Sequence, residues 1–456
     1  MFPELSISQD RKSLSERFRA LAHAAPEHPA IIDGTTGSVT SRSSLLARAE
    51  ILRARLKSSG IAAGDRVGIQ LPNSVDFVAA FLAAAELGCT TLPIDRDARK
   101  SEIGATLNHF GVRALIYISG ASDEFPSISV REVPSPSAEE ADVVLIKLTS
   151  GSTGMPRGIL TTAGNLIADC RNICETMEIR ATDRNLGAIP FSHSYGFSNL
   201  VTPLLLLGTT IVVSNDYLPH SILNLSNTFA CTVLPGIPMM FEHLSQLPRD
   251  DGRFATMRSF ISAGAPLSAS VSRRFRERFG QPIHSFYGCS ECGGIAYDRE
   301  GGAVERARVG SAMKNVKLAI DPDSSRLLVE SEAVAIGYLD GPGGNTRFSG
   351  NRFLTDDLAR LDDALELELT GRVGDLINTA GKKVNPREVE TVILQMKGVR
   401  QARVFGEAAG ARGEVVAAVV VADPDVTREQ VRTFCGARLS SHKVPRIVKF
   451  IESIPL

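Results

Sequence analysis

The sequence predicts an α/β fold in which a large N-terminal domain with mainly parallel sheets is followed by a small α+β domain. The chain has 456 residues, too many for one small core, so two or three domains are expected. In the first part of the chain, apolar runs of strand length alternate with helical patterns, which is typical of parallel sheets joined by helices. After residue 385 the pattern becomes helix, strand, strand, helix and strand, as in a compact α+β unit.

Composition and charge argue against several classes of protein. Hydrophobic residues make up 43% of the chain and charged residues 22%, as in ordinary soluble proteins. The formal net charge of −1 gives no electrostatic case for nucleic acid or an anionic membrane as a partner. The first residues lack a basic stretch followed by an apolar run, so no signal peptide is expected. The apolar segment 200–213 is shorter than the roughly 20 residues of a spanning helix and contains Pro203 and Gly208, so we expect a buried helix end and strand.

The cysteines favour a reducing compartment, and we expect a cytoplasmic protein. There are seven of them, an odd number without regular spacing, which argues against a disulfide framework. Cys289 and Cys292 have the spacing of a redox dithiol or of half a zinc site. No second C-x-x-C or histidine pair accompanies them, so metal or redox chemistry is not favoured. Cys170 and Cys174 are spaced for one face of a helix.

Periodicity and turn residues predict the elements before residue 141. Residues 14–25 should form a helix that ends before Pro26, and residues 30–33 should form an edge strand. From Ser43, apolar residues recur on one helix face until Gly60 closes the helix. Residues 119–141 are rich in Ser, Pro, Asp and Glu and should form a surface connection. Further expected elements are a strand within 64–73, a buried helix at 75–87, a strand at 90–94, a helix at 100–109 and a strand at 114–118.

A loop rich in glycine and hydroxyl residues follows a predicted strand at 143–148. Glycines let backbone N–H groups approach an anion closely, hydroxyls add donors, and Arg157 adds a forked positive charge. This chemistry suits polyphosphate. Flexible linkers have the same composition, however, and the Walker pattern is absent, so the residues alone leave both interpretations open.

The whole stretch 148–158 closely resembles the signature loop of the adenylate-forming superfamily, which includes the AMP-dependent acyl- and aryl-CoA synthetases. The GDRV and LPNS phrases at 64–67 and 71–74 resemble the same family, so the resemblance covers nearly the whole chain. Arg157 replaces the usual lysine, and Ser152 stands where many members have threonine. The resemblance implies that the ATP phosphates are bound here, with a catalytic role for Thr153. The residues concerned are Thr149, Ser150, Gly151, Ser152, Thr153, Gly154 and Arg157.

His193 lies in a turn-rich segment, 188–196, between apolar runs. A lone histidine is more often structural than functional. The resemblance implies instead that this segment lines the acyl pocket and gives His193 a catalytic, gating role. The aspartate that amino-acid-activating relatives carry in this segment is absent, which disfavours an α-amino acid, and the apolar stretch 234–244 favours an uncharged aromatic or aliphatic acid. The other expected pocket residues are Gly236, Met239, Gly264 and Gly293.

Two further motifs are implied to bind the nucleotide. The turn at 262–267 could be an ordinary tight turn. It resembles the family segment that packs against adenine, with Gly264, Ala265 and Pro266 in the matching positions. The motif Tyr287-Gly288-Cys-Ser290-Glu291 resembles the family's Y-G-x-T-E. The resemblance implies that Tyr287 faces the purine, that Ser290 bonds the α-phosphate and that Glu291 is the catalytic ligand of Mg²⁺.

The remaining motifs lie around an expected domain boundary at residue 371. Asp357 and Arg372 match the residues that bind the ribose, whereas Asp356 replaces a glycine and adds a negative charge that could weaken ATP binding. The resemblance implies an N-terminal domain at 1–371 and a mobile C-terminal domain at 372–456, with Gly374 as the hinge and Gly381 and Lys383 in the thiol tunnel.

These residues together predict an AMP-forming acid–thiol ligase. ATP and a carboxylic acid would give an acyl-adenylate, from which coenzyme A displaces AMP. Mg²⁺ would assist, no protein nucleophile is needed, and the protein would act as a monomer or homodimer. The sequence stops at Leu456, just short of the family's final G-K motif, and we expect a tail that carries this lysine. Transfer to a carrier-protein pantetheine, a luciferase-like oxygenase and an impaired nucleotide-binding homologue remain alternatives.

Overall fold

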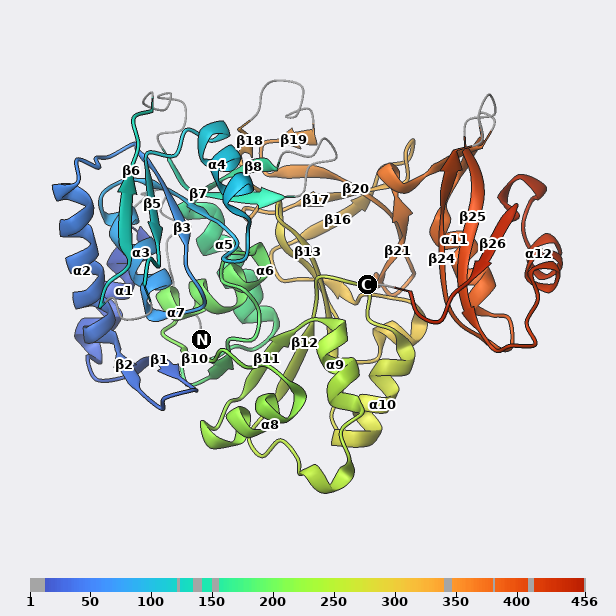
Figure 1. Ribbon diagram of the computed structural model, residues 1–456, viewed down its shortest axis with the longest axis horizontal. Helices are drawn as coiled ribbons and strands as arrows, with labels where there is room; N and C mark the ends of the chain where they lie inside the picture. The colour runs from blue at the N-terminus through green and yellow to red at the C-terminus, as the bar shows by residue number, and fades with distance from the viewer. Residues whose placement is uncertain are drawn as a thin grey trace. The chain divides into compact units, whose positions relative to one another are not determined.

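The structure is a computed structural model that describes residues 13–120, 124–133, 142–149, 156–339, 347–379, 382–408 and 414–454 (Figure 1). The chain divides into two compact units. The first comprises Met1–Leu318 with Val329–Phe353, and the second comprises Ala319–Leu328 with Leu354–Leu456. The predicted boundary at residue 371 separates two domains that would move relative to each other, and it stays a prediction.

A seven-stranded sheet in the first unit has the order β18-β8-β7-β4-β3-β5-β6. Its four middle strands are parallel, while β6, β8 and β18 pair antiparallel at the two edges. The middle strands are buried, as parallel strands covered on both faces require. The bounds are β3 Arg66–Gln70, β4 Thr90–Pro93, β5 Ala114–Tyr117, β6 Ser127–Val130, β7 Val143–Thr149, β8 Arg157–Thr162 and β18 Gly337–Tyr338.

A nine-stranded sheet has the order β15-β14-β13-β12-β11-β9-β10-β1-β2. The six strands from β13 to β1 are parallel, and β2, β14 and β15 pair antiparallel at the ends. Together the two sheets confirm the predicted α/β fold. The bounds are β1 Pro29–Asp33, β2 Val39–Ser41, β9 Arg184–Leu186, β10 Thr210–Val213, β11 Val233–Gly236, β12 Ser259–Ser262, β13 His284–Cys289, β14 Gly293–Tyr297 and β15 Ser311–Ala312.

Two strand predictions need correction. Strand β1 is not an edge strand, because it pairs with β10 on one side and with β2 on the other. The three-residue β2 is too short to give a periodic signal. Within the predicted surface connection, residues 127–130 form β6, which pairs antiparallel with β5. Strand β6 lies at a sheet edge with none of its side chains fully buried, so its polar composition concealed it.

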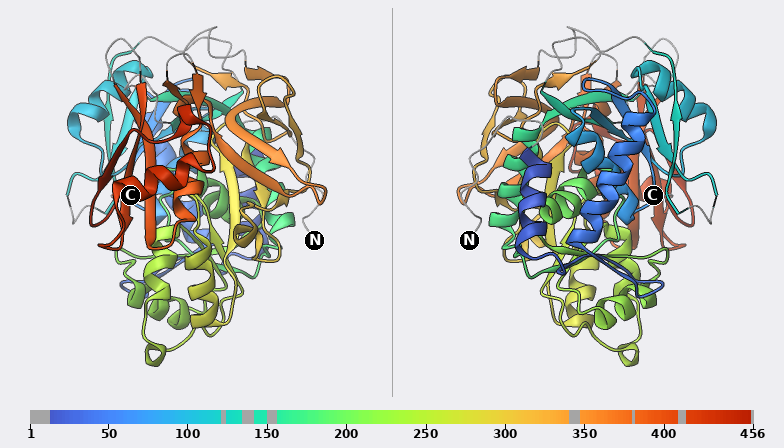
Figure 2. Two further views of the ribbon diagram at one scale, coloured as in Figure 1. Left: turned by 90° about the vertical axis from the view of Figure 1, so that its right-hand side faces the viewer. Right: turned by 90° about the vertical axis from the view of Figure 1, so that its left-hand side faces the viewer.

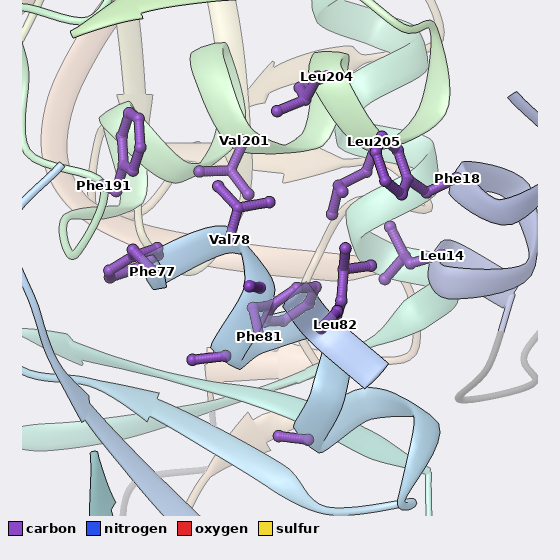
Figure 3. Packing of buried hydrophobic residues seen from close by; sticks show 14 of the residues in the cluster. Leu14, Phe18, Phe77, Val78, Phe81, Leu82, Phe191, Val201, Leu204 and Leu205 are labelled. Atoms are coloured by element: carbon purple, nitrogen blue, oxygen red, sulfur yellow. The ribbon is translucent and has the colours of Figure 1, made fainter. Parts of the chain in front are cut away.

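Helices α1, α2, α3, α5 and α7 form the larger hydrophobic core with the sheet faces (Figures 1 and 2). Helix α3 is buried on nearly every side, as its continuous apolar sequence predicts, and Ser74 caps it by accepting from the Phe77 backbone N–H. Figure 3 shows Phe77 against Phe191, whose ring centroids are 5.6 Å apart. This contact packs the segment before His193 against α3. The bounds are α1 Ser13–Ala24, α2 Arg42–Ser58, α3 Val75–Glu86, α5 Ala163–Thr176 and α7 Thr202–Leu206.

A second core lies beside the nine-stranded sheet, where α8, α9 and α10 pack (Figure 1). Phe260 of β12 meets Phe241 of α9 and Phe275 of α10, with ring centroids 6.4 and 4.9 Å away. Elsewhere in this unit, α4 spans Lys100–His109 as predicted. None of the helices in the described part of the chain is long and apolar enough to cross a membrane. The bounds are α8 Pro219–Thr228, α9 Pro238–Ser245 and α10 Ala269–Phe279.

The second unit has the predicted order of helix, strand, strand, helix and strand after residue 385. Its core joins Val389 and Ile393 of α11 with Val404 of β24 and Val431 of α12. Between residues 317 and 372, a further small sheet, which is not confined to one unit, has the order β16-β17-β20-β19, with β21 on β20. The bounds are β16 Lys317–Ile320, β17 Arg326–Glu330, β19 Phe348–Ser349, β20 Arg352–Leu361, β21 Leu367–Arg372, β22 Ile377–Thr379, β23 Lys382–Val384, α11 Pro386–Leu394, β24 Val399–Ala408, β25 Glu414–Ala422, α12 Arg428–Gly436 and β26 Ile447–Phe450.

Candidate active site

The first unit contains a cavity of about 390 Å³ at the carboxyl ends of β9, β11, β12 and β13. These strands are parallel neighbours, so their carboxyl ends meet at one edge of the sheet, where α/β proteins bind ligands. None of the described lining residues is Asp, Glu, Lys or Arg, so this part of the cavity suits an uncharged group. They are Ile189, Pro190, His193, Ser194, Tyr195, Gly196, Ser198, Asn199, Ile237, Ala263, Gly264, Phe286, Gly288, Cys289, Ser290, Gly293 and Gly294.

His193 lies at the mouth of this cavity. It lines the cavity, yet 60% of its side chain is exposed, and its Nε2 is 3.5 Å from Oδ2 of Asp95, which is also largely exposed. An ion pair between two such exposed groups contributes little stability. The backbone of His193 is fixed by its carbonyl, which accepts from the Phe197 N–H at the start of the following helical segment.

Asn73 positions the segment that leads to His193. Its Nδ2 donates to the carbonyls of Gly187 and Ile189 at 2.9 and 2.8 Å, and its Oδ1 accepts from the Phe191 N–H at 2.7 Å. One amide thus holds three backbone groups. Asn73 belongs to the LPNS phrase, where sequence reasoning took it only as the end of a strand.

Tyr195 and Phe286 form an aromatic wall, with ring centroids 5.6 Å apart. The Tyr195 hydroxyl donates to the Ile261 carbonyl of β12 at 3.0 Å. Burial raises the pKa of Tyr195 well above its ordinary value, so the hydroxyl remains neutral. This wall therefore presents ring surface to a ligand.

The Y-G-C-S-E motif forms the end of β13 and the turn into β14. Gly288 faces Gly294 across the hairpin, and a Cβ at Gly288 would overlap with the Gly293 carbonyl, so no larger residue fits there. Ser194 donates to Oγ of Ser290 at 2.8 Å. Since Ser194 is the donor, the Ser290 hydroxyl can direct its own hydrogen to a ligand oxygen. The structure thus brings the His193 segment and this motif together.

Glu291 is oriented by Tyr338 of β18, which sequence reasoning missed. The Tyr338 hydroxyl donates to Oε1 of Glu291 at 2.8 Å, and the Ala335 N–H donates to the Glu291 carbonyl at 2.8 Å. Burial, followed by the negative charge of Glu291, raises the pKa of Tyr338. The Arg157 guanidinium lies 5.4 Å from the centroid of the Tyr338 ring, a cation–π contact. Arg157 also pairs with Thr149 across the β7–β8 hairpin.

This arrangement fits Mg²⁺ bound mainly through a substrate. Glu291 keeps one carboxylate oxygen that Tyr338 does not occupy, and one carboxylate with phosphate oxygens is a usual environment for Mg²⁺. Among the described residues there is no group of three or more His, Cys, Asp or Glu side chains that could hold a metal ion by itself. All seven cysteines are free, and Cys289 lines the cavity.

The acyl-pocket residues predicted from the sequence divide into two groups. His193, Gly264 and Gly293 line the cavity, and the two glycines have φ of +86° and +70°. Gly236 and Met239 do not line it. Gly236 is buried at the end of β11, and Met239 on α9 is 42% exposed. Both stay predictions as pocket residues.

The structure describes only part of the residues predicted to bind the nucleotide. Ala265 and Pro266 lie on the exposed turn after β12, and Tyr287 is half-buried in β13. Five phosphate-loop residues lie outside the described residues, as does Gly381 of the thiol tunnel, and their roles stay predictions. The five are Ser150, Gly151, Ser152, Thr153 and Gly154. Lys383 lies in β23.

The second unit contains the predicted ribose and hinge residues. Arg372 faces Asp357 across β20 and β21, with Nε 3.8 Å from Oδ1. Asp356 carries a charge that is already paired, since its Oδ1 lies 3.2 Å from Nη2 of Arg326. Gly374 lies in a short 3₁₀ turn, has ordinary negative φ and has open space where a Cβ would be. Neither sterics nor φ requires glycine at position 374.

Comparison with known proteins agrees with this geometry. A family model described as AMP-binding enzyme matches residues 18–339, and one described as AMP-binding enzyme C-terminal domain matches residues 388–456. A long-chain-fatty-acid–CoA ligase of Mycobacterium tuberculosis is 25% identical, with 97% of this chain and 95% of the relative covered. A feruloyl-CoA synthase of Amycolatopsis is 26% identical, with 95% and 94% covered.

Solved structures share the fold. The crystal structure of ATP-bound MatB from Rhodopseudomonas palustris has a TM-score of 0.79 and 25% identity, and covers 97% of this chain and 95% of its own. A Mycobacterium tuberculosis fatty acyl CoA synthetase has a TM-score of 0.80, 24% identity and coverage of 98% and 96%. At that identity the second structure shows the fold alone.

Proposed function

The chain belongs to the family of AMP-binding enzymes, and on this premise we propose that it activates a carboxylic acid with ATP and transfers the acyl group to coenzyme A. One observation carries the proposal. The cavity without charged walls is lined by Gly264, Gly288 and Ser290, which belong to the two motifs expected to bind adenine and the α-phosphate. An acyl group in the cavity would therefore have its carboxylate beside a nucleotide phosphate.

In the first half-reaction, a carboxylate oxygen forms a bond to the α-phosphorus, and the bond from that phosphorus to the bridging oxygen of pyrophosphate breaks. Two anions must approach each other, so positioning and charge neutralisation are the main requirements. Ser290 would donate to an α-phosphate oxygen. Arg157 would place its charge near the phosphates from the base of the hairpin.

Glu291 would hold Mg²⁺, which when bound neutralises charge on the phosphate oxygens. The hydrogen bond from Tyr338 leaves one Glu291 oxygen directed elsewhere and keeps the carboxylate in one orientation. In this proposal the role of the chain's own residues is to hold the acid, the nucleotide and this carboxylate in register.

In the second half-reaction, the thiol sulfur attacks the acyl carbon, and AMP leaves with the electrons of the acyl–oxygen bond. Relatives named as CoA ligases support coenzyme A as the thiol rather than a carrier protein. We place the thiol near Gly381 and Lys383 and the pivot at Gly374, between domains 1–371 and 372–456. Asp357 and Arg372 would bind the ribose, as their cross-strand pairing suggests.

The cavity supports an uncharged acyl group as substrate. Its walls combine Tyr195 and Phe286 with Ile189 and Ile237, and polar groups are confined to hydroxyls, an amide, a thiol and His193. A second carboxylate or an α-ammonium group would be desolvated there without a partner, which costs several kcal/mol. Aromatic and medium-sized aliphatic acids therefore suit it best.

ATP–pyrophosphate exchange across a panel of carboxylic acids tests the proposal. We expect exchange with at least one aromatic or aliphatic acid, followed by AMP release that depends on coenzyme A. Absence of exchange with every acid, at ATP concentrations that saturate binding, would contradict the proposal. Release of AMP that depends on a carrier protein but not on coenzyme A would change only the acceptor.

Two wider features belong to the same proposal. Seven free cysteines favour a reducing cytoplasm as the protein's location. Large exposed apolar side chains are spread over separate segments, among them Val39, Leu218 and Leu365, and we propose a monomer or homodimer.

A further inference from the structure

Asp169, in the middle of α5, has a carboxylate buried directly behind the wall of the cavity. The residue is only 2% exposed. Its Oδ2 accepts from the Ser198 hydroxyl at 2.6 Å, and its Oδ1 accepts from the Gly294 N–H at 2.9 Å. Both donors line the cavity, whereas Asp169 itself does not. One carboxylate thus joins two parts of the wall that are about a hundred residues apart in sequence.

The backbone around Gly294 is shaped to admit this carboxylate. Gly293 has φ of +70°, and a Cβ there would overlap with Oδ1, Oδ2 and Cγ of Asp169. Gly294 faces Gly288 across the hairpin, so Asp169 holds the hairpin at the pair beside the Y-G-C-S-E turn. The Ser198 side belongs to the five-residue π-helical segment Phe197–Val201, a rare form that is frequent at functional sites.

We propose that Asp169 is a positioning residue that sets the size of the acyl group the cavity accepts, by fixing the Ser198 wall and the Gly293–Gly294 wall relative to each other. This inference rests on the proposed function. A buried carboxylate that accepts two hydrogen bonds resists displacement, because either donor would otherwise be buried without a partner. The distance between the two walls then depends on the Asp169 side chain.

The sharpest readout is the ratio of kcat/KM for two acids of different size. Effects common to all acids, such as a smaller folded fraction or weaker ATP binding, cancel in this ratio. The probes are straight-chain acids of increasing length together with benzoate, and the ratio compares the best acid of the wild-type protein with the next larger one.

Asp169→Ala should raise the relative kcat/KM of the larger acid about tenfold, since the walls lose their common anchor. Asp169→Asn should leave the ratio within about twofold, because its oxygen can accept from Gly294 while its amide donates to the Ser198 hydroxyl. Asp169→Glu keeps the charge but adds a methylene in a space without room, so the walls must move inward and the ratio should fall. The Glu variant keeps the test decisive should the Ala variant fail to fold.

Asp298→Ala is the matched control. Asp298 is 3% exposed and accepts from the Gly301 and Ala303 N–H groups at 2.9 and 2.8 Å, but it does not line the cavity. It should lower the melting temperature without changing the ratio. An unchanged ratio in both the Ala and Glu variants of Asp169, or an equal change in Asp298→Ala, would overturn the inference. If the wild-type protein activates no acid, the proposed function fails; if it does and only the ratios stay constant, this inference fails alone.

Discussion

The Glu291 carboxylate, in the turn after β13, is oriented by a hydrogen bond from Tyr338 on β18. Replacing Glu291 by Gln removes the charge that would hold Mg²⁺ but preserves the shape of the side chain. Metal charge stabilisation is worth several kcal/mol, so Glu291→Gln should reduce adenylate formation at least about a hundredfold. Pyrophosphate exchange measured against Mg²⁺ concentration checks this.

Tyr338→Phe is the companion variant. It removes the hydroxyl that donates to Oε1, so we expect a loss of about tenfold and a higher Mg²⁺ requirement. Near wild-type exchange in Glu291→Gln would show that another group holds the metal. A larger loss in Tyr338→Phe than in Glu291→Gln would also contradict the assignment.

Asp356, the residue that replaces a family glycine, is neutralised within its own unit. Arg326 pairs with it and also donates to the Thr355 and Leu354 carbonyls at 2.6 and 3.1 Å. Both side chains are about one fifth exposed, so the pair should contribute about 1 kcal/mol or less. Asp356→Gly should therefore change the KM for ATP less than about threefold, measured by exchange. A large fall in KM would show that the carboxylate does repel the nucleotide.

At the scale of elements, the loop between β9 and the His193 turn is held in place by its hydrogen bonds with Asn73. Asn73→Ala would leave two carbonyls and one N–H without their partner. We expect the free energy of unfolding to fall by about 2–3 kcal/mol and the KM for the acid to rise. Denaturant unfolding and exchange kinetics measure the two effects. Asn73→Asp is the control, because it keeps the acceptor for Phe191 and should lose less stability at low pH, where the carboxyl group can donate.

At the scale of the whole molecule, the proposed mechanism requires the C-terminal domain to rotate about Gly374. Gly374→Pro should restrict φ to about −65° and favour one pose, so the two half-reactions should be affected unequally. Exchange reports the first half-reaction, and conversion of a supplied acyl-adenylate by coenzyme A reports the second.

Gly374→Ala is the matched control, since a Cβ has open space there and φ is ordinary. It should retain stability and both half-reactions. Equal loss of both half-reactions in the Pro variant, together with a lower melting temperature, would indicate a structural residue rather than a hinge.

The sequence alone determined the order of elements and the position of the chemical motifs. Apolar periodicity is local, so α3 and α4 agree with the helices predicted at 75–87 and 100–109, and the family that the resemblance implied is confirmed. The roles of His193, Ser290 and Glu291 stay predictions. Local pattern failed where the signal was short or half-exposed, as in β2 and β6.

Only the tertiary structure decided which side chains hold the site together. Asn73, Asp169 and Tyr338 bond to groups that lie 114–118, 29–125 and 47 residues away along the chain. No periodicity links such positions, because Asn73 follows β3, Asp169 lies on α5 and Tyr338 lies on the antiparallel edge strand β18. Their partners become neighbours only when helices and sheets pack together. An apolar stretch likewise does not say which residues of a helix face outward, and Met239 on α9 is 42% exposed.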